Sequence, residues 1–98
     1  MATLLNAVTT DTVGSATTHS GPATVFVTGT PDGANVVLQI SPTTNTTDFV
    51  KIDRSIMPVS LFVNQTGACA VDAQGTYSLR AILQNAGSST SVTVTSTQ

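Results

Sequence analysis

Apolar residues along the chain recur in short, β-branched runs, and no stretch shows the 3.6-residue period of an amphipathic helix. Glycine, proline, asparagine and aspartate separate the runs roughly every 8 to 12 residues, a spacing typical of antiparallel sandwiches. The runs lie at residues 3–9, 23–29, 35–41, 49–53, 59–63, 68–71, 76–84 and 91–95. We therefore predict an all-β fold: a single antiparallel β-sandwich, immunoglobulin-like in outline, with seven to eight strands.

The turn signals divide the chain further. Residues 1–22 are predicted to form an N-terminal strand or arm followed by a loop at 14–21, and residues 23–98 to form the β-sandwich domain. Pro31 and Gly33 mark a turn, since proline presets φ and glycine accepts a positive φ. This turn predicts a hairpin over 23–41. Residues 2–13 are either the first strand of the sandwich or an arm that reaches a neighbouring subunit or the surface of a larger assembly to which the protein binds.

A second local motif precedes the longest run. Gly75 lies two residues before Tyr77, as in the tyrosine corner of immunoglobulin-like sandwiches, where the phenol bonds to an upstream backbone group. A plain glycine turn is the alternative. The chain has one cysteine and no tryptophan, which excludes a true antibody-type domain. We expect Cys69 to be a small buried thiol in a strand.

Several runs carry apolar residues on both faces of the predicted strand: 25–27, 36–38, 61–63 and 81–83. A strand with one face in water should alternate apolar and polar residues. Either the patterning is imperfect or shifted by a bulge, or some outer faces are buried against sister subunits. The candidate interface residues are Leu4, Leu5, Val8, Phe26, Phe62, Lys51, Arg54 and Arg80.

Charge is scarce in this chain. Only 8% of residues are charged, and Lys51, Arg54 and Arg80 are the only basic residues. Their side chains either pair with Asp48 and Asp53 or form bridges between subunits. Three cations are too few for electrostatic nucleic-acid binding, and no basic amphipathic helix is present to bind a membrane surface.

The polar residues are mainly threonine and serine, with 19 and 10 residues. The chain has only four aromatic residues, which predicts a modest core. With 40% hydrophobic residues and a net charge of -2, a folded module is expected. Contact with a partner is a natural way for so small a core to gain burial. Self-assembly into a homo-oligomer is therefore an early hypothesis.

The inventory of catalytic side chains is thin. His19 is the only histidine; Ser20 and Asp11 could complete a triad with it, but no nucleophile-elbow pattern supports this. The five aspartates are scattered singly at turns and strand ends, where they commonly bond to backbone. We expect no enzyme activity, no catalytic residues, no cofactor and no metal site.

Several segments together resemble small virion proteins of tailed bacteriophages. These segments are 21–29 (GPATVFVTG), 31–42 (PDGANVVLQISP), 75–81 (GTYSLRA) and 87–94 (GSSTSVTV). Such proteins often carry an aromatic residue, commonly tryptophan, just after the loop that ends here at Asp48, where this chain has Phe49. The likeness covers most of residues 20–96 and consists of strands and turns, with no catalytic signature.

The resemblance implies a capsid decoration (cement) protein, a small β-sandwich, often trimeric, that binds the outside of the assembled head. Its implied partners are sister copies and the major capsid protein. Its implied location is the virion surface after synthesis in the host cytoplasm. Two alternatives remain open: a tail, neck or fibre component with the same fold, and a carbohydrate-binding adhesin module, which the scarcity of aromatic residues disfavours.

Overall fold

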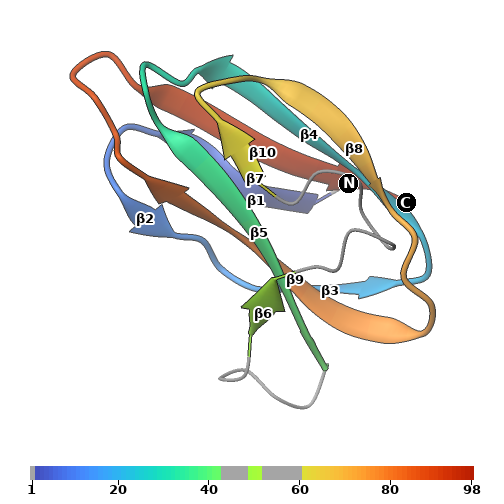
Figure 1. The fold of residues 1–98 in the computed structure, drawn as a ribbon. Helices are drawn as coiled ribbons and strands as arrows, with labels where there is room; N and C mark the ends of the chain where they lie inside the picture. Colours follow the sequence, from blue (N-terminus) through green and yellow to red (C-terminus); the bar gives the residue numbers. More distant parts are fainter. Residues whose placement is uncertain (1, 43–48, 52–60) are drawn as a thin grey trace.

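The computed structural model describes residues 2–42, 49–51 and 61–98, in which ten strands and no helix are found (Figure 1). Most are built from β-branched residues that alternate between a buried and an outward side. The strands are β1 (Ala2–Val8), β2 (Thr12–Val13), β3 (Thr17–Ser20), β4 (Ala23–Thr30), β5 (Asn35–Pro42), β6 (Val50–Lys51), β7 (Leu61–Val63), β8 (Gly67–Val71), β9 (Thr76–Gln84) and β10 (Ser91–Thr97).

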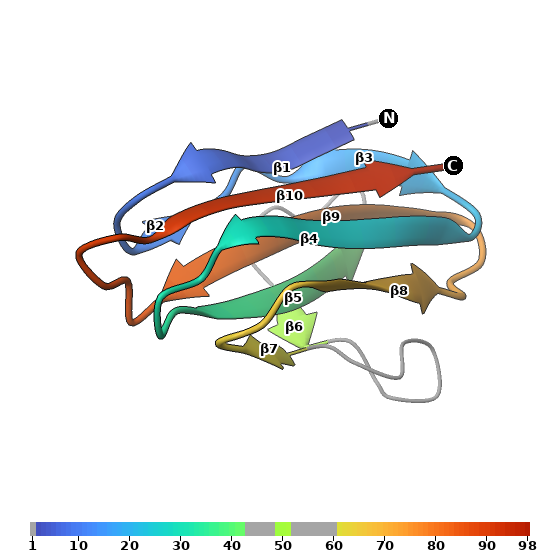
Figure 2. The same ribbon diagram turned by 90° about the horizontal axis from the view of Figure 1, so that it is seen from above.

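The strands form two antiparallel sheets that pack face to face (Figure 2). The first sheet has the order β1-β10-β4-β8. In the second, β9 and β5 are central, β2 and β3 pair with the free side of β9, and β6 and β7 pair with β5. The predicted all-β antiparallel sandwich is confirmed.

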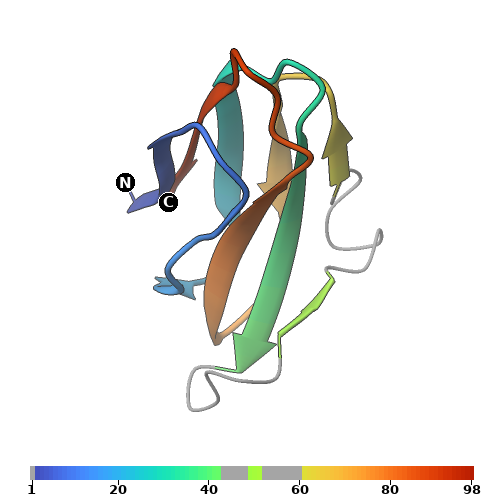
Figure 3. The same ribbon diagram turned by 90° about the vertical axis from the view of Figure 1, so that its left-hand side faces the viewer.

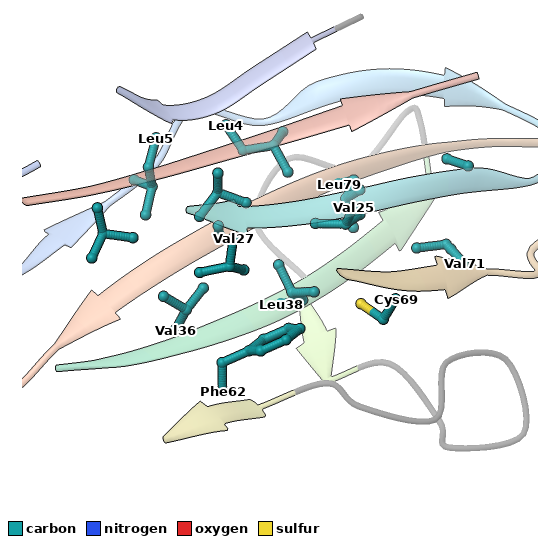
Figure 4. Close-up of a cluster of buried hydrophobic side chains, with 14 of the residues drawn as sticks. Leu4, Leu5, Val25, Val27, Val36, Leu38, Phe62, Cys69, Val71 and Leu79 are labelled. Atoms are coloured by element: carbon teal, nitrogen blue, oxygen red, sulfur yellow. The ribbon is translucent and has the colours of Figure 1, made fainter. Parts of the chain in front are cut away.

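The two sheets face each other when the sandwich is viewed from its side (Figure 3). The core between them is built mainly from leucine and valine. Val25 and Val27 face inward from the first sheet, and Leu38 and Leu79 from the second, each at most 1% exposed (Figure 4). Cys69 also faces the core from β8, which confirms the prediction of a buried thiol.

The predicted hairpin over residues 23–41 is wrong, because β4 and β5 lie in different sheets. Their connection is nevertheless a tight turn, in which the Ala34 amide donates to the Pro31 carbonyl at 3.0 Å. Asp32 and Gly33 have φ values of 47° and 85°, so both central residues of this turn are left-handed. A turn signal of this kind fixes the reversal of the chain but not which strands then pair.

The prediction of a loop over the polar segment 14–21 is only partly correct. Residues 17–20 form β3, which pairs with β9. His19 supplies the reason. Its ring is 3% exposed and stacks on Tyr77, its register partner in β9, with ring centroids 5.7 Å apart. A single large side chain thus anchors a strand whose neighbours are all small and polar.

The N-terminal segment forms a strand of the sandwich, since β1 pairs antiparallel with β10. Its pairing is irregular: the register shifts between Thr3 and Leu5 and again between Leu5 and Val8. These shifts allow two consecutive residues, Leu4 and Leu5, to be buried together at 3% and 4% exposure. This arrangement corresponds to the first interpretation of residues 2–13, in which they begin with a strand of the sandwich.

The position of the last strand differs from that in immunoglobulin domains. There the final two strands belong to the same sheet. Here β9 lies in the second sheet, whereas β10 crosses over and lies between β1 and β4 in the first. As a result β10 and β4, both rich in threonine, form the centre of the first sheet.

Candidate interaction surfaces

The outward side of the first sheet, which we call the threonine face, carries no charged residue. It is defined by Thr3 of β1, Thr93, Thr95 and Thr97 of β10, Thr24, Phe26 and Thr28 of β4, and Ala68 and Ala70 of β8. Strand alternation produces this face, because the intervening residues of β4 and β10 are buried. Threonine suits such a position, being β-branched and hydroxylated.

Phe26 is the one large apolar side chain of the threonine face and is 38% exposed. It lies in a row across the sheet between Thr95 and Ala68. The next row along the strands consists of Thr97, Thr24 and Ala70. This second row forms part of the lining of a depression of about 420 Å³ at the end of the sheet, whose other lining residues are Pro22, Ala23, Val71, Asp72 and Gln98. The partly exposed Phe26 ring therefore lies one row away from a hollow that continues past the end of the threonine face.

The outward side of the second sheet carries an apolar row of its own. Val13, Ile82 and Val37 occupy register partners on β2, β9 and β5. Val13 is 60% exposed, Ile82 half-buried and Val37 6% exposed. The central residues of the runs 25–27, 36–38 and 81–83 thus face outward. The strands that carry these runs pair in continuous register, β4 with β8 and β10, and β5 with β9. The bulges lie in β1, so no bulge explains these apolar residues.

Arg80 lies on the same outward side as Val37 and Ile82. Its Nε donates to Gln39 Oε1 at 2.9 Å, and its Cζ lies 3.9 Å from the centre of the Phe49 ring. This is a cation–π contact. Arg54, Asp48 and Asp53 lie outside the described residues, and of Lys51 the structure describes only the backbone.

The structure places the other candidate interface residues mostly in the core. Leu4, Leu5 and Phe62 are each less than 5% exposed, and Val8 packs partly buried against them. These side chains offer little surface to a neighbour in this arrangement. Among the described candidates, Phe26 and Arg80 face outward from the two sheets.

A polar cluster joins the sheets near the chain ends. The Nε2 atom of His19 in β3 lies 2.5 Å from the Ser96 hydroxyl in β10, and its Nδ1 lies 2.9 Å from the Thr17 carbonyl oxygen. A carbonyl only accepts, so Nδ1 carries a hydrogen, and Nε2 of the neutral ring accepts from Ser96. Ser96 is 1% exposed. The contact is a buried bridge between strands 77 residues apart in sequence.

Tyr77 extends this cluster. Its hydroxyl donates to the Gly21 carbonyl at 2.7 Å, and the Gly21 amide donates to the Gly75 carbonyl at 2.9 Å. The acceptor lies 56 residues away and not a few residues upstream, so the contact differs from a tyrosine corner. Gly75 has a φ of 76°, which fits the alternative of a glycine turn. Burial raises the pKa of the Tyr77 phenol.

The structure does not assemble the triad considered from sequence. Asp11 accepts the Ala86 amide at 2.9 Å, and Ser20 bonds through its backbone to Gln98. His19 bonds Ser96 instead, a partner with no local sequence signal. Since that hydroxyl is buried and part of the sheet interior, the pair is positioned to hold the sheets together.

Residues 2–42, 49–51 and 61–98 contain no group of three or more metal-ligating side chains. The same residues include no helix of the length and apolar character needed to cross a membrane.

Comparison with known proteins adds no relative. No family model, curated protein or solved structure matches this chain.

Proposed function

We propose that this chain is a non-enzymatic structural protein of a virus particle: a capsid decoration (cement) protein that binds the outer surface of the head as a homo-oligomer and stabilises it. It acts through contact surfaces and needs no catalytic group or cofactor. Its partners are sister copies and the major capsid protein. The trimeric state is the one that the resemblance to phage virion proteins implies.

The threonine face is the observation that carries the proposal. It spans all four strands of one sheet without a charged residue and exposes Phe26 at its centre. Charged groups are costly to desolvate at the centre of a protein interface, whereas aromatic rings are enriched there. A uniform face of this kind favours packing against another protein surface.

The resemblance to phage virion proteins is the basis for assigning this chain to a virus particle. Its four segments fall mainly on β4, β5, β9 and β10, the central strands of the two sheets. They therefore make up much of the body of the sandwich and include four of the nine residues of the threonine face. This placement supports a likeness in overall architecture, which is the level at which decoration proteins act.

Co-sedimentation tests the proposal. Purified protein is mixed with expanded heads, and separately with isolated tails, of the phage that encodes it, and each mixture is separated on a sucrose gradient. The expected result is saturable binding to heads and none to tails. Binding to tails alone, or to neither, would overturn the proposal. The soluble protein run alone controls for aggregation.

A further inference from the structure

We propose that the threonine face is the surface on which a second copy of this chain docks, with Phe26 of each copy seated in the depression beside Thr24, Ala70 and Thr97 of the other. This inference names a surface for self-association, and the two-fold dimer that it describes is a different assembly from the trimer that the resemblance implies. It does not depend on the particle to which the protein binds.

The geometry of the face supports a two-fold contact. In such a contact, residue i of one copy touches residue j of the other and the reverse, so knob and hollow must lie on the same surface. Phe26 and Thr24 are two positions apart on β4, and both point outward. Rotation by 180° about an axis between them places each ring over the other copy's hollow. A face with a ring and no hollow would not complement itself in this way.

The chemistry of the face also favours a copy of itself. Threonine hydroxyls both donate and accept hydrogen bonds, so two threonine surfaces can satisfy each other. The nine residues of the face carry no charge, and Asp72 is the charged residue that lines the depression beside them. A partner that carried charge would find no counter-charge on these nine residues.

The size of the face is sufficient for a weak dimer. Four strands at a spacing of about 4.8 Å, with about seven residues at roughly 3.4 Å each, cover about 450 Å². Two copies would bury on the order of 1,000 Å² once side-chain relief is included, at the lower limit for a specific interface. We therefore expect association that depends on concentration in the micromolar range or above.

Sedimentation equilibrium measures this association directly. For a chain of 10.0 kDa, the wild type should pass from monomer towards twice that mass as its concentration rises from a few micromolar to about a millimolar. Phe26→Lys should raise the dissociation constant at least about tenfold. Val13→Lys, the same kind of change on the outward side of the other sheet, should leave it unchanged. Circular dichroism confirms that each variant is folded.

A second variant separates the knob-in-hollow contact from general apolar adhesion. Ala70→Leu partly fills the depression and makes the face more apolar. Loss of the hollow should weaken association, whereas simple adhesion would strengthen it. The inference is overturned by a monomer at all concentrations, by a trimer that persists in Phe26→Lys, by weakening in Val13→Lys alone, or by tighter association of Ala70→Leu. Binding of heads by a monomeric protein would leave the proposed decoration role standing and remove only this inference.

Discussion

The buried bridge between His19 and Ser96 allows a direct test of how the two sheets are held together. Ser96→Ala removes the hydroxyl that donates to His19 Nε2 at 2.5 Å. His19→Phe keeps a ring to stack on Tyr77 but removes both ring nitrogens. The double variant replaces both partners with apolar groups. Together with the wild type, these proteins form a double-mutant cycle.

The magnitude follows from burial. His19 is 3% exposed and Ser96 is 1% exposed, so a group left without its partner loses a hydrogen bond that water does not replace. We expect each single variant to lose about 1–3 kcal/mol of unfolding free energy, with a coupling energy of about 1 kcal/mol. For a domain of this size, each kcal/mol lowers the melting temperature by about 4–8 °C.

Urea unfolding at neutral pH, followed by far-ultraviolet circular dichroism, gives the four free energies. Ser91→Ala is the matched control, since this residue lies on the same strand and is exposed, and it should change stability by less than about 0.5 kcal/mol. A coupling energy below about 0.3 kcal/mol would refute the argument, because the two side chains would then contribute independently.

Three other predictions concern single positions. Tyr77→Phe should cost about 1 kcal/mol in urea unfolding, because its hydroxyl donates to the Gly21 carbonyl at 2.7 Å; unchanged stability would contradict this bond. Gly29→Ala should lose more than about 2 kcal/mol in thermal melts, since a Cβ there overlaps a backbone carbonyl of β10, whereas Gly33→Ala meets open space and should lose only about 1 kcal/mol; equal losses would refute this contrast. Burial raises the pKa of the Cys69 thiol from 9.0 to about 11, so at pH 8 alkylation of the native protein should be about 100-fold slower than in urea. Since the unfolded thiol ionises first, the stability contributed by this group is complete below pH 9 and is lost as pH rises through 11; a Cys69→Ala variant whose unfolding free energy falls as steeply over that range would contradict the assignment.

The sandwich could be predicted from the sequence because its signals are local. Alternation along 91–97 and turn residues between runs identify strands and reversals wherever the strands finally pair. Pairing is not local, and this is why the hairpin over 23–41 was wrong. The residues of the turn after Pro31 suit a return to the same sheet as well as a connection to the other sheet, so they do not distinguish the two.

The candidate surface was only partly predictable, for a related reason. Phe26 stands between outward threonines in β4, so alternation alone identifies its side. In the run 61–63 every residue is apolar, and only tertiary packing decides that Phe62 faces the core while Val63 is 57% exposed. Leu4 and Leu5 are both buried in the core because the pairing of β1 is irregular, and no local sequence motif indicates this irregularity.

Two features define the proposed role: the location of this chain on the outside of the head, and the burial of its threonine face against a sister copy. Cryo-microscopy of the particle that carries it tests both together. The account predicts density for the sandwich on the outside of the head shell, with Phe26 of each copy buried against a sister copy. Density confined to the tail, or copies whose threonine face is turned to solvent, would contradict it.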